Sequence, residues 1–255
     1  MLDRRTFYIG GAWVAPREGT DFPVEDPSRE EPFATIALAG PADTDAAVAA
    51  ARRAFPGWAA TPPAERIALV ERLLEAYRAR EEEMAETISR EMGAPIDLSR
   101  AAQAPAGTEA IADYLEAVRD FAFERPLRAD TPHDRILMEP AGVCALITPW
   151  NWPMNQVALK VVPALLAGCT MVLKPSEIAP LSGALFAEIV DAAGAPPGVF
   201  NLVHGDGAGA GSRLSAHPEI DMVSFTGSTR AGTAISKAAA DTLKRVHLEL
   251  GGKGA

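Results

Sequence analysis

The chain has 255 residues, of which 48% are hydrophobic and 23% charged, with 2 Cys and a formal net charge of -10. These values are typical of a soluble globular protein, and they exclude a collagen, a coiled coil, a disordered tail and a disulfide-stapled secreted module. The acid excess argues against a nucleic-acid partner, because binding to phosphates needs clustered Lys and Arg and the sequence has no basic block.

No run of about 18 uncharged apolar residues is present, so no membrane-spanning helix is predicted. Arg4-Arg5-Thr6-Phe7 is superficially similar to a twin-arginine export signal, but the apolar stretch after it is short and is split by Gly10-Gly11. It also lacks a small-residue cleavage site. We therefore expect a cytoplasmic protein with no membrane attachment, whose partner is a small molecule or another protein.

The first part of the chain predicts a β-hairpin, an extended segment and a helical segment. Residues 7–14 are expected to form two short strands turned at Gly10-Gly11, because glycine tolerates positive φ at both central turn positions. A second extended segment is expected at 33–38. Thr61 is the predicted N-cap of the helical segment, in which apolar residues recur at helical spacing until Gly93-Ala94-Pro95 ends it.

From Gly142 onward, short apolar runs without alternation are separated by segments of helix length. Such runs are typical of parallel strands buried on both faces, and right-handed crossovers make the sheet doubly wound. We therefore predict an α/β fold with a doubly wound parallel sheet over residues 141–255. Residues 1–140 would form a smaller β and helical part that packs on it, with 126–132 as an exposed ribbon or linker. The predicted strands are 143–147, 170–173, 199–203, 222–225 and 246–250.

Ligands of an open parallel sheet bind beyond the carboxyl ends of its strands, and polar or glycine-rich residues follow all five predicted strands. Taken singly, each set has an ordinary structural explanation. Asn151 and Ser228 are candidate helix caps, Lys174 and Glu177 a candidate solvated loop pair, and Glu249 a candidate exposed strand end. The sets are Thr148-Pro149-Trp150-Asn151-Trp152-Pro153, Lys174-Pro175-Ser176-Glu177, residues 204–211, Thr226-Gly227-Ser228-Thr229 and Glu249-Leu250-Gly251-Gly252-Lys253.

The glycine cluster satisfies the dinucleotide-binding pattern G-x-G-x-x-G/A through Gly205, Gly207 and Ala210. The match is weak by itself, because Gly and Ala are abundant throughout the chain. The acidic residue that should bind the ribose about 20 residues later is also absent, since Phe225-Thr226-Gly227-Ser228 stands there.

Taken together and in order, the five sets resemble the NAD(P)-dependent aldehyde dehydrogenase superfamily. The resemblance extends from Phe7 to the last residues and therefore covers essentially the whole chain. It implies a Rossmann-like NAD-binding domain and the oxidation of an aldehyde to a carboxylic acid, with water as the second substrate.

The resemblance implies NAD as the cofactor, with NADP less favoured. Lys174 and Glu177 would hold the adenosine ribose hydroxyls, and the Glu177 carboxylate would repel a 2′-phosphate. Ser228, with backbone N–H groups at a helix start, would bind the pyrophosphate. The other cofactor-binding residues implied are Ile147, Pro149 and Trp150 on the route to the nicotinamide, the closely approached Gly207, Gly211 and Gly227, and Ser176, Phe225, Thr226 and Leu250.

The resemblance also implies two catalytic residues and no metal site. Asn151 would donate its side-chain N–H to the oxyanion formed when a thiolate attacks the aldehyde, a contribution of roughly 3 kcal/mol in comparable sites. Glu249 would activate the water that hydrolyses the thioester left after hydride transfer. Trp152, Met154 and Gln156 suggest an apolar to mildly polar aldehyde channel.

The chain departs from the family in the position of its cysteines. The family's nucleophilic cysteine lies a few tens of residues beyond the glutamate motif, whereas six residues follow Glu249 here. Cys144 and Cys169 fall in or beside apolar strands and are expected to be inert. We therefore expect this chain to be the amino-terminal portion of an enzyme, inactive alone, whose full-length form is a homodimer or homotetramer.

Smaller departures concern three charged or titratable positions. His204 replaces a common proline, and Asp206 adds a negative charge near the expected pyrophosphate, where Arg230 would compensate. Two alternatives stay open: a non-catalytic NAD-binding fragment or interaction module, and a CoA-acylating semialdehyde dehydrogenase. Glu249 disfavours the second, because a water-activating base suits hydrolysis.

Overall fold

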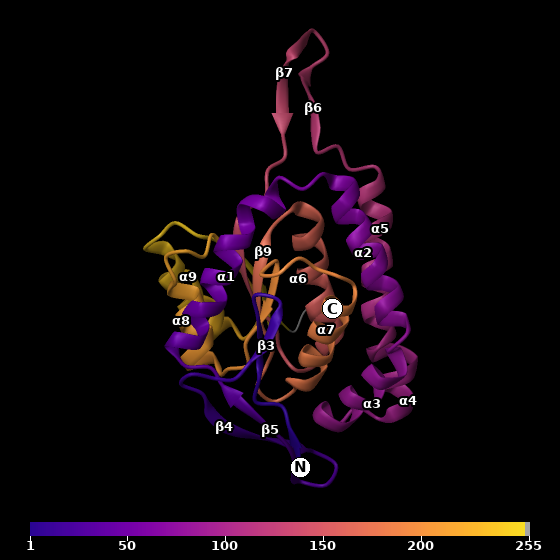
Figure 1. The fold of residues 1–255 in the computed structure, drawn as a ribbon, viewed down its shortest axis with the longest axis vertical. Helices are drawn as coiled ribbons and strands as arrows, with labels where there is room; N and C mark the ends of the chain where they lie inside the picture. Colours follow the sequence, from indigo (N-terminus) through magenta and orange to yellow (C-terminus); the bar gives the residue numbers. More distant parts are fainter. Residues whose placement is uncertain (253–255) are drawn as a thin grey trace.

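The computed structural model describes residues 1–252, apart from the side chain of Pro132. A central sheet is covered by helices on both faces, and a hairpin projects from one end (Figure 1). The sheet contains seven strands, in the order β12 (Arg245–Leu250), β11 (Met222–Gly227), β8 (Val143–Ile147), β9 (Thr170–Lys174), β10 (Phe200–Leu202), β2 (Phe7–Ile9) and β3 (Ala12–Val14).

The five strands predicted from the apolar runs are confirmed, and they are parallel to one another. β8 and β9 are buried along their whole length, which explains why their sequences do not alternate. β8 pairs with β9 on one side and with β11 on the other. The strand order therefore reverses at β8, and ligands of such sheets bind at the carboxyl ends beside this reversal.

The amino-terminal hairpin extends the same sheet. Its turn has φ of 63° at Gly10 and 85° at Gly11, as predicted. β2 lies antiparallel to β10, with Leu202 opposite Tyr8. The Gly10 backbone N–H donates to Oδ1 of Asn201 in β10 at 2.8 Å, which fixes the turn against this strand. A hairpin from the start of the chain thus covers what would otherwise be an open sheet edge.

Two smaller sheets complete the strands of residues 1–252. The extended segment predicted at 33–38 is confirmed as β5 (Glu31–Leu38), which lies between β1 (Leu2–Asp3) and β4 (Thr20–Asp26). The predicted ribbon at 126–132 forms a hairpin of β6 (Glu124–Arg128) and β7 (Thr131–Leu137). β6 is exposed along its whole length, and the hairpin stands clear of the body (Figure 1).

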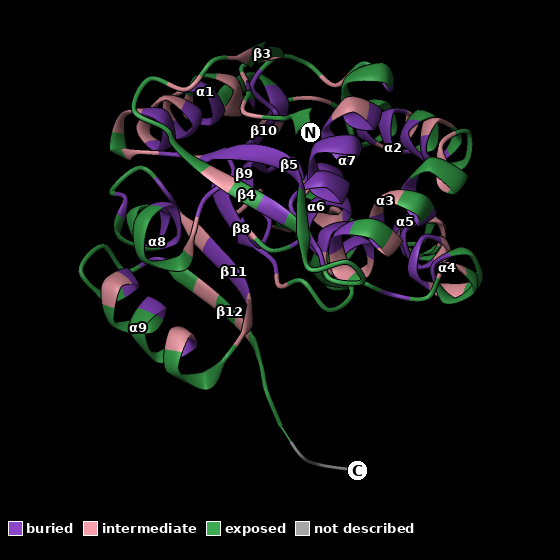
Figure 2. Ribbon diagram, turned by 90° about the horizontal axis from the view of Figure 1, so that it is seen from below, coloured by how far each residue is buried: buried purple, intermediate pink, exposed green. Residues whose placement is uncertain are grey.

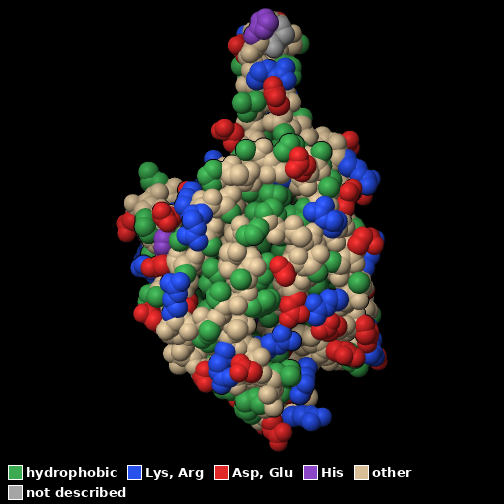
Figure 3. Space-filling view, in the orientation of Figure 1, with side chains coloured by type: hydrophobic (Ala, Val, Ile, Leu, Met, Phe, Trp, Pro, Cys, Tyr) green, Lys and Arg blue, Asp and Glu red, His purple; other side chains and the backbone are tan. Residues whose placement is uncertain are grey.

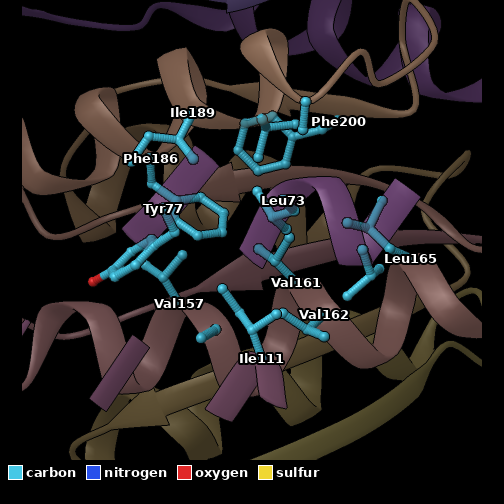
Figure 4. Close-up of a cluster of buried hydrophobic side chains, with 14 of the residues drawn as sticks. Leu73, Tyr77, Ile111, Val157, Val161, Val162, Leu165, Phe186, Ile189 and Phe200 are labelled. Atoms are coloured by element: carbon cyan, nitrogen blue, oxygen red, sulfur yellow. The ribbon is translucent and has the colours of Figure 1, made fainter. Parts of the chain in front are cut away.

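One face of the sheet carries the larger helical layer and the main core. Figure 4 shows part of this core, in which Tyr77, Ile111, Val161 and Phe186 meet from four different helices. The layer comprises α2 (Pro63–Arg78), α3 (Glu81–Met92), α5 (Pro105–Arg119), α6 (Pro153–Ala167) and α7 (Leu181–Ala192), with the short α4 (Ile96–Leu98) and η1 (Ser99–Gln103) between α3 and α5.

The predicted helical segment forms two helices, α2 and α3. The predicted end at Gly93 is confirmed, since Gly93 has a φ of 80° after the last residue of α3. The predicted Thr61 cap is wrong: Pro62 occupies the N-cap of α2, and the Thr61 hydroxyl donates to the carbonyl of Gly57 at 3.0 Å. Thr61 therefore closes the turn after the preceding helix.

The other face carries α1 (Pro41–Ala59), η2 (Gly207–Gly211), α8 (Ser212–Ala216) and α9 (Thr229–Ala240). Figure 2 shows buried strands between the two helical layers. Among the helices of residues 1–252, none is long and apolar enough to cross a membrane.

Candidate functional site

Two cavities open beside the carboxyl ends of the parallel strands. The large cavity, of about 800 Å³, lies over the ends of β8, β11 and β12. The slot, of about 370 Å³, lies between η2, α8 and α9. The start of α9 borders both, because Gly227 and Ser228 line the large cavity while Arg230 and Ala231 line the slot.

The large cavity brings together predicted residues that are up to about a hundred positions apart in the chain. They are Pro149, Trp150 and Asn151 after β8, Thr226, Gly227 and Ser228 from β11 onward, and Glu249 and Leu250 at the end of β12. The slot contains four more, Ile147, Gly207, Gly211 and Phe225.

Lys174, Ser176 and Glu177 line neither cavity, and of the three Lys174 has an atom close to the lining of the slot. A methyl group placed on Gly211 would be 3.9 Å from Cδ of Lys174. The Ser176 hydroxyl accepts the backbone N–H of Ile178 at 3.3 Å, so Ser176 orders the loop after β9.

Asn151 does not cap the helix that follows it. α6 begins with Trp152 as its N-cap, and no side chain supplies a capping hydrogen bond there. The backbone carbonyl of Asn151 accepts from Nε2 of Gln103 at 3.4 Å, which ties this loop to η1. The structural explanation by helix capping is therefore wrong for Asn151, whose amide is available to a ligand in the large cavity.

Lys174 is a buried, fixed ammonium rather than half of a solvated pair. Its side chain is 3% exposed, and Nζ donates to the carbonyls of Pro175 at 2.9 Å and Gly205 at 2.6 Å. Burial lowers the pKa of Lys174, and the Glu177 carboxylate, 3.6 Å from Nζ, acts in the opposite direction. An ammonium has three N–H donors, so two are committed to the protein and one remains toward Glu177 and its surroundings.

Glu249 shares the large cavity with groups that sequence motifs did not identify. Its side chain is 64% exposed, and Oε1 lies 3.5 Å from Nε2 of His247. Lys160 of α6 also lines this cavity and is buried. Burial lowers the pKa of Lys160, and the Glu249 carboxylate counteracts that effect. The cavity therefore combines an accessible carboxylate with a largely desolvated ammonium.

The residues that were missed share a face with predicted ones. Ser224 and His247 lie two positions before Thr226 and Glu249 on the same strands, and alternate strand residues point to the same side. Lys160 lies four positions after Gln156 on α6, a spacing that places both on one helix face. Strand alternation and helical spacing were thus the signals that could have identified them.

Of the three residues assigned to the aldehyde channel, one lines the large cavity. Gln156 lines the large cavity. Met154 is fully buried in the core, so its assignment to a channel is wrong, because α6 turns this residue toward the sheet. Trp152 is 38% exposed and does not line the large cavity.

The backbone and orphaned polar atoms fit a bound dinucleotide. The hydroxyl of Thr226 is buried and has no partner within the described part of the chain. A Cβ added at Gly207 would meet nothing within 4 Å, so protein packing does not require glycine there. Because Gly207 has no side chain, the backbone itself forms the wall of the slot at this position, and a ligand can approach it closely. Ser228 caps α9 by accepting the Ala231 N–H at 3.2 Å, at a helix end that favours anions.

Both cysteines are remote from solvent. Cys144 is 2% exposed and Cys169 is 3% exposed, and neither forms a disulfide. The neighbouring Cys169 and burial raise the pKa of the Cys144 thiol. The hydrogen bond from Cys144 and backbone groups lower the pKa of Cys169 to about 7, against the effect of burial. An activated nucleophile needs an accessible thiolate, and burial withholds both Cys144 and Cys169 from a substrate.

Comparison with known proteins adds independent information. The family model described as "Aldehyde dehydrogenase family" matches residues 13–255. The chain is 54% identical to a 3-succinoylsemialdehyde-pyridine dehydrogenase from a Pseudomonas species, over 100% of this chain and 53% of that protein.

Solved structures agree with this match. An aldehyde dehydrogenase from Bartonella henselae superposes with a TM-score of 0.98 and 57% identity, covering 100% of this chain and 54% of that one. A mutant of aldehyde dehydrogenase C from Pseudomonas syringae, in complex with NAD+ and octanal, superposes with a TM-score of 0.94 and 50% identity. This match covers 98% of this chain and 51% of that one. The chain therefore spans about half the length of the relatives it matches.

Proposed function

This chain belongs to the aldehyde dehydrogenase family, and we propose that it supplies the NAD site and two catalytic groups of an enzyme that oxidises an aldehyde to a carboxylic acid. The observation that carries the proposal is the convergence of Asn151, Ser228 and Glu249 on one cavity from three strand ends. The slot beside that cavity has the size and apolar lining of a small-molecule site.

The cofactor roles rest on the fixed groups around the slot. Lys174 and Glu177 hold the adenosine ribose hydroxyls, and the Glu177 carboxylate selects NAD by repelling a 2′-phosphate. The Ser228 hydroxyl and the N–H groups at the start of α9 bind the pyrophosphate. NAD, when bound, accepts the hydride from the substrate carbon. The remaining predicted contacts are Ile147, Pro149, Trp150, Ser176, Gly207, Gly211, Phe225, Thr226, Gly227 and Leu250.

The catalytic roles follow from polarity and access. Asn151 donates an amide N–H to the oxyanion that forms when a thiolate attacks the aldehyde, which lowers the barrier by roughly 3 kcal/mol. The Glu249 carboxylate, accessible to solvent, takes a proton from the water that hydrolyses the thioester. The attacking thiolate is supplied by a cysteine of the enzyme other than Cys144 and Cys169. The dimeric or tetrameric state and the cytoplasmic location stay predictions.

For the 255-residue chain by itself, a second function is favoured: NAD binding without turnover. The burial of both Cys144 and Cys169 supports it, because no accessible thiol is present to form a covalent intermediate.

An aldehyde oxidation assay tests the catalytic proposal. The purified 255-residue chain, supplied with NAD and octanal, is expected to give no steady NADH production. In the longer enzyme that the proposal implies, Asn151→Ala should lower kcat by about 100-fold or more, because the oxyanion loses a donor. Asn155→Ala, the same substitution in the first turn of α6 and outside the lining of the large cavity, is the control and should stay near the wild-type rate.

Two outcomes would contradict this account. One is steady NADH production by the 255-residue chain that persists in both Cys144→Ala and Cys169→Ala. The other is an Asn151→Ala enzyme as active as Asn155→Ala. Release of acyl-CoA in place of the free acid would favour the CoA-acylating alternative.

A further inference from the structure

The slot is an apolar space whose wall carries one charged side chain among the described residues. Ile147 and Phe225 come from the ends of β8 and β11, and small residues such as Ala234 line the side formed by α9. Arg230, in the first turn of α9, is the charged residue of this lining. A space of about 370 Å³ with apolar walls suits a planar ring such as adenine.

The charge of Arg230 is not used by the protein. None of the ion pairs or side-chain hydrogen bonds found within residues 1–252 involves Arg230, which is exposed. Arg213 on the adjacent α8 behaves differently, since it forms two bonds of 2.7 Å with the carboxylate of Asp45. An arginine that lines a cavity without an acidic partner is ready to bind an anion there.

The acid nearest in sequence to the slot does not neutralise Arg230. The Asp206 carboxylate accepts the backbone N–H of Gly209 at 2.6 Å and caps η2. Burial lowers the pKa of Lys174, and the charge of Asp206, like that of Glu177, partly offsets this effect. Arg230 was expected to compensate the negative charge of Asp206, but the two side chains form no ion pair among the described residues. The guanidinium of Arg230 is therefore free to bind a ligand.

The position of α9 decides which part of a ligand Arg230 would meet. Gly227 and Ser228 line the large cavity, whereas Arg230 and Ala231 line the slot, so the first turn of α9 lies between the two. A dinucleotide with its adenine in the slot and its other ring in the large cavity must cross this turn with its pyrophosphate.

We propose that Arg230 is a cofactor-binding residue whose guanidinium pairs with the pyrophosphate of NAD, beside the Ser228 hydroxyl and the free N–H groups of α9. The inference rests on the proposed function. Guanidinium–phosphate pairs form charge-assisted and often bidentate hydrogen bonds, which contribute more than a backbone N–H alone. The positive charge of Arg230 thereby offsets the negative charges that Asp206 and Glu177 place near the cofactor's pyrophosphate.

Titration calorimetry of the 255-residue chain tests this assignment. Arg230→Gln is expected to weaken the binding of NAD and of ADP-ribose by about tenfold and to leave the affinity for adenosine unchanged. Arg230→Lys should recover part of the loss. Lys237→Gln makes the same charge change on the same helix outside the slot and should bind like wild type. Added salt should narrow the difference between wild type and Arg230→Gln.

The outcomes separate this inference from the proposed function. Equal NAD affinity of Arg230→Gln and Lys237→Gln, with wild-type binding intact, would overturn the role of Arg230 alone. That role is likewise overturned if Arg230→Gln loses affinity for NADP but not for NAD, since the guanidinium would then serve a ribose phosphate. A wild-type chain that does not bind NAD would overturn both.

Discussion

His204 is a fully buried imidazole beside the Lys174 ammonium. Neither of its ring nitrogens has a hydrogen-bond partner among the residues described. Burial and the charge of Lys174 lower the pKa of His204 to about 3 from 6.5. The unfolded chain binds a proton at this residue below about pH 6.5, and the folded chain does so only near pH 3. The free energy of unfolding must therefore fall as pH drops through this range.

Replacing His204 should remove that part of the pH dependence. Between about pH 6.5 and 5.5, wild type is expected to lose about 1 kcal/mol more stability than His204→Leu, because one proton is taken up on unfolding. Urea unfolding at several pH values measures the difference. His133→Leu, at an exposed position of the β6–β7 hairpin, is the control and should keep the wild-type profile. Parallel pH profiles for wild type and His204→Leu would contradict this assignment.

Single residues of the site were predictable where a motif follows a strand. Lys174 and Glu249 lie at the ends of β9 and β12, and Asn151 lies in the loop that follows β8, so their cavity or its neighbourhood followed from topology. The state of each side chain did not follow. The burial of Lys174 depends on the carbonyl of Gly205, 31 positions away, and sequence spacing does not reveal such a contact.

At the scale of elements, a carboxylate from one helix caps another. Glu91, in the last turn of α3, is 1% exposed and accepts the backbone N–H groups of Leu181 and Ser182 at the start of α7. These donors have no partner within their own helix. Burial raises the pKa of Glu91 to about 7, against the lowering effect of the N–H groups.

Glu91→Gln should reveal how much this cap stabilises the fold. The amide keeps one acceptor and places an NH₂ group against a backbone donor, so we expect a loss of about 2 kcal/mol in the free energy of unfolding. Glu86→Gln, an exposed neighbour on the same helix, should change stability by less than about 0.5 kcal/mol. Chemical denaturation at neutral pH compares them, and equal midpoints for the two variants would argue against the cap.

The elements differ in how far sequence alone predicts them. β8, β9 and β10 were predictable because burial on both faces makes them continuous apolar runs. β12 was predicted on the same ground, although it lies at the edge of the sheet and is largely exposed. α1 was missed because its buried face consists mostly of alanines and polar residues, such as Ala47, Ala51 and Thr44, and shows no strong apolar stripe. The pairing of β2 with β10 was missed because it joins residues almost two hundred positions apart, and local pattern carries no register between them.

At the scale of the molecule, the site depends on the meeting of distant strand ends. β8, β11 and β12 are adjacent in the sheet although about a hundred residues separate the first from the last. On the face seen in Figure 3, Lys and Arg are interspersed with Asp and Glu. A small-molecule ligand at the strand ends thus agrees with the acidic composition of the whole chain.

The central claim is that these strand ends form an NAD site, and titration calorimetry of NAD into the 255-residue chain tests it most directly. We expect one NAD bound per chain and an affinity at least about tenfold weaker in Lys174→Ala and Glu177→Ala, because each loses a partner of the ribose hydroxyls. Lys237→Ala should bind like wild type. Absence of NAD binding, or unchanged affinity in both Lys174→Ala and Glu177→Ala, would contradict the claim.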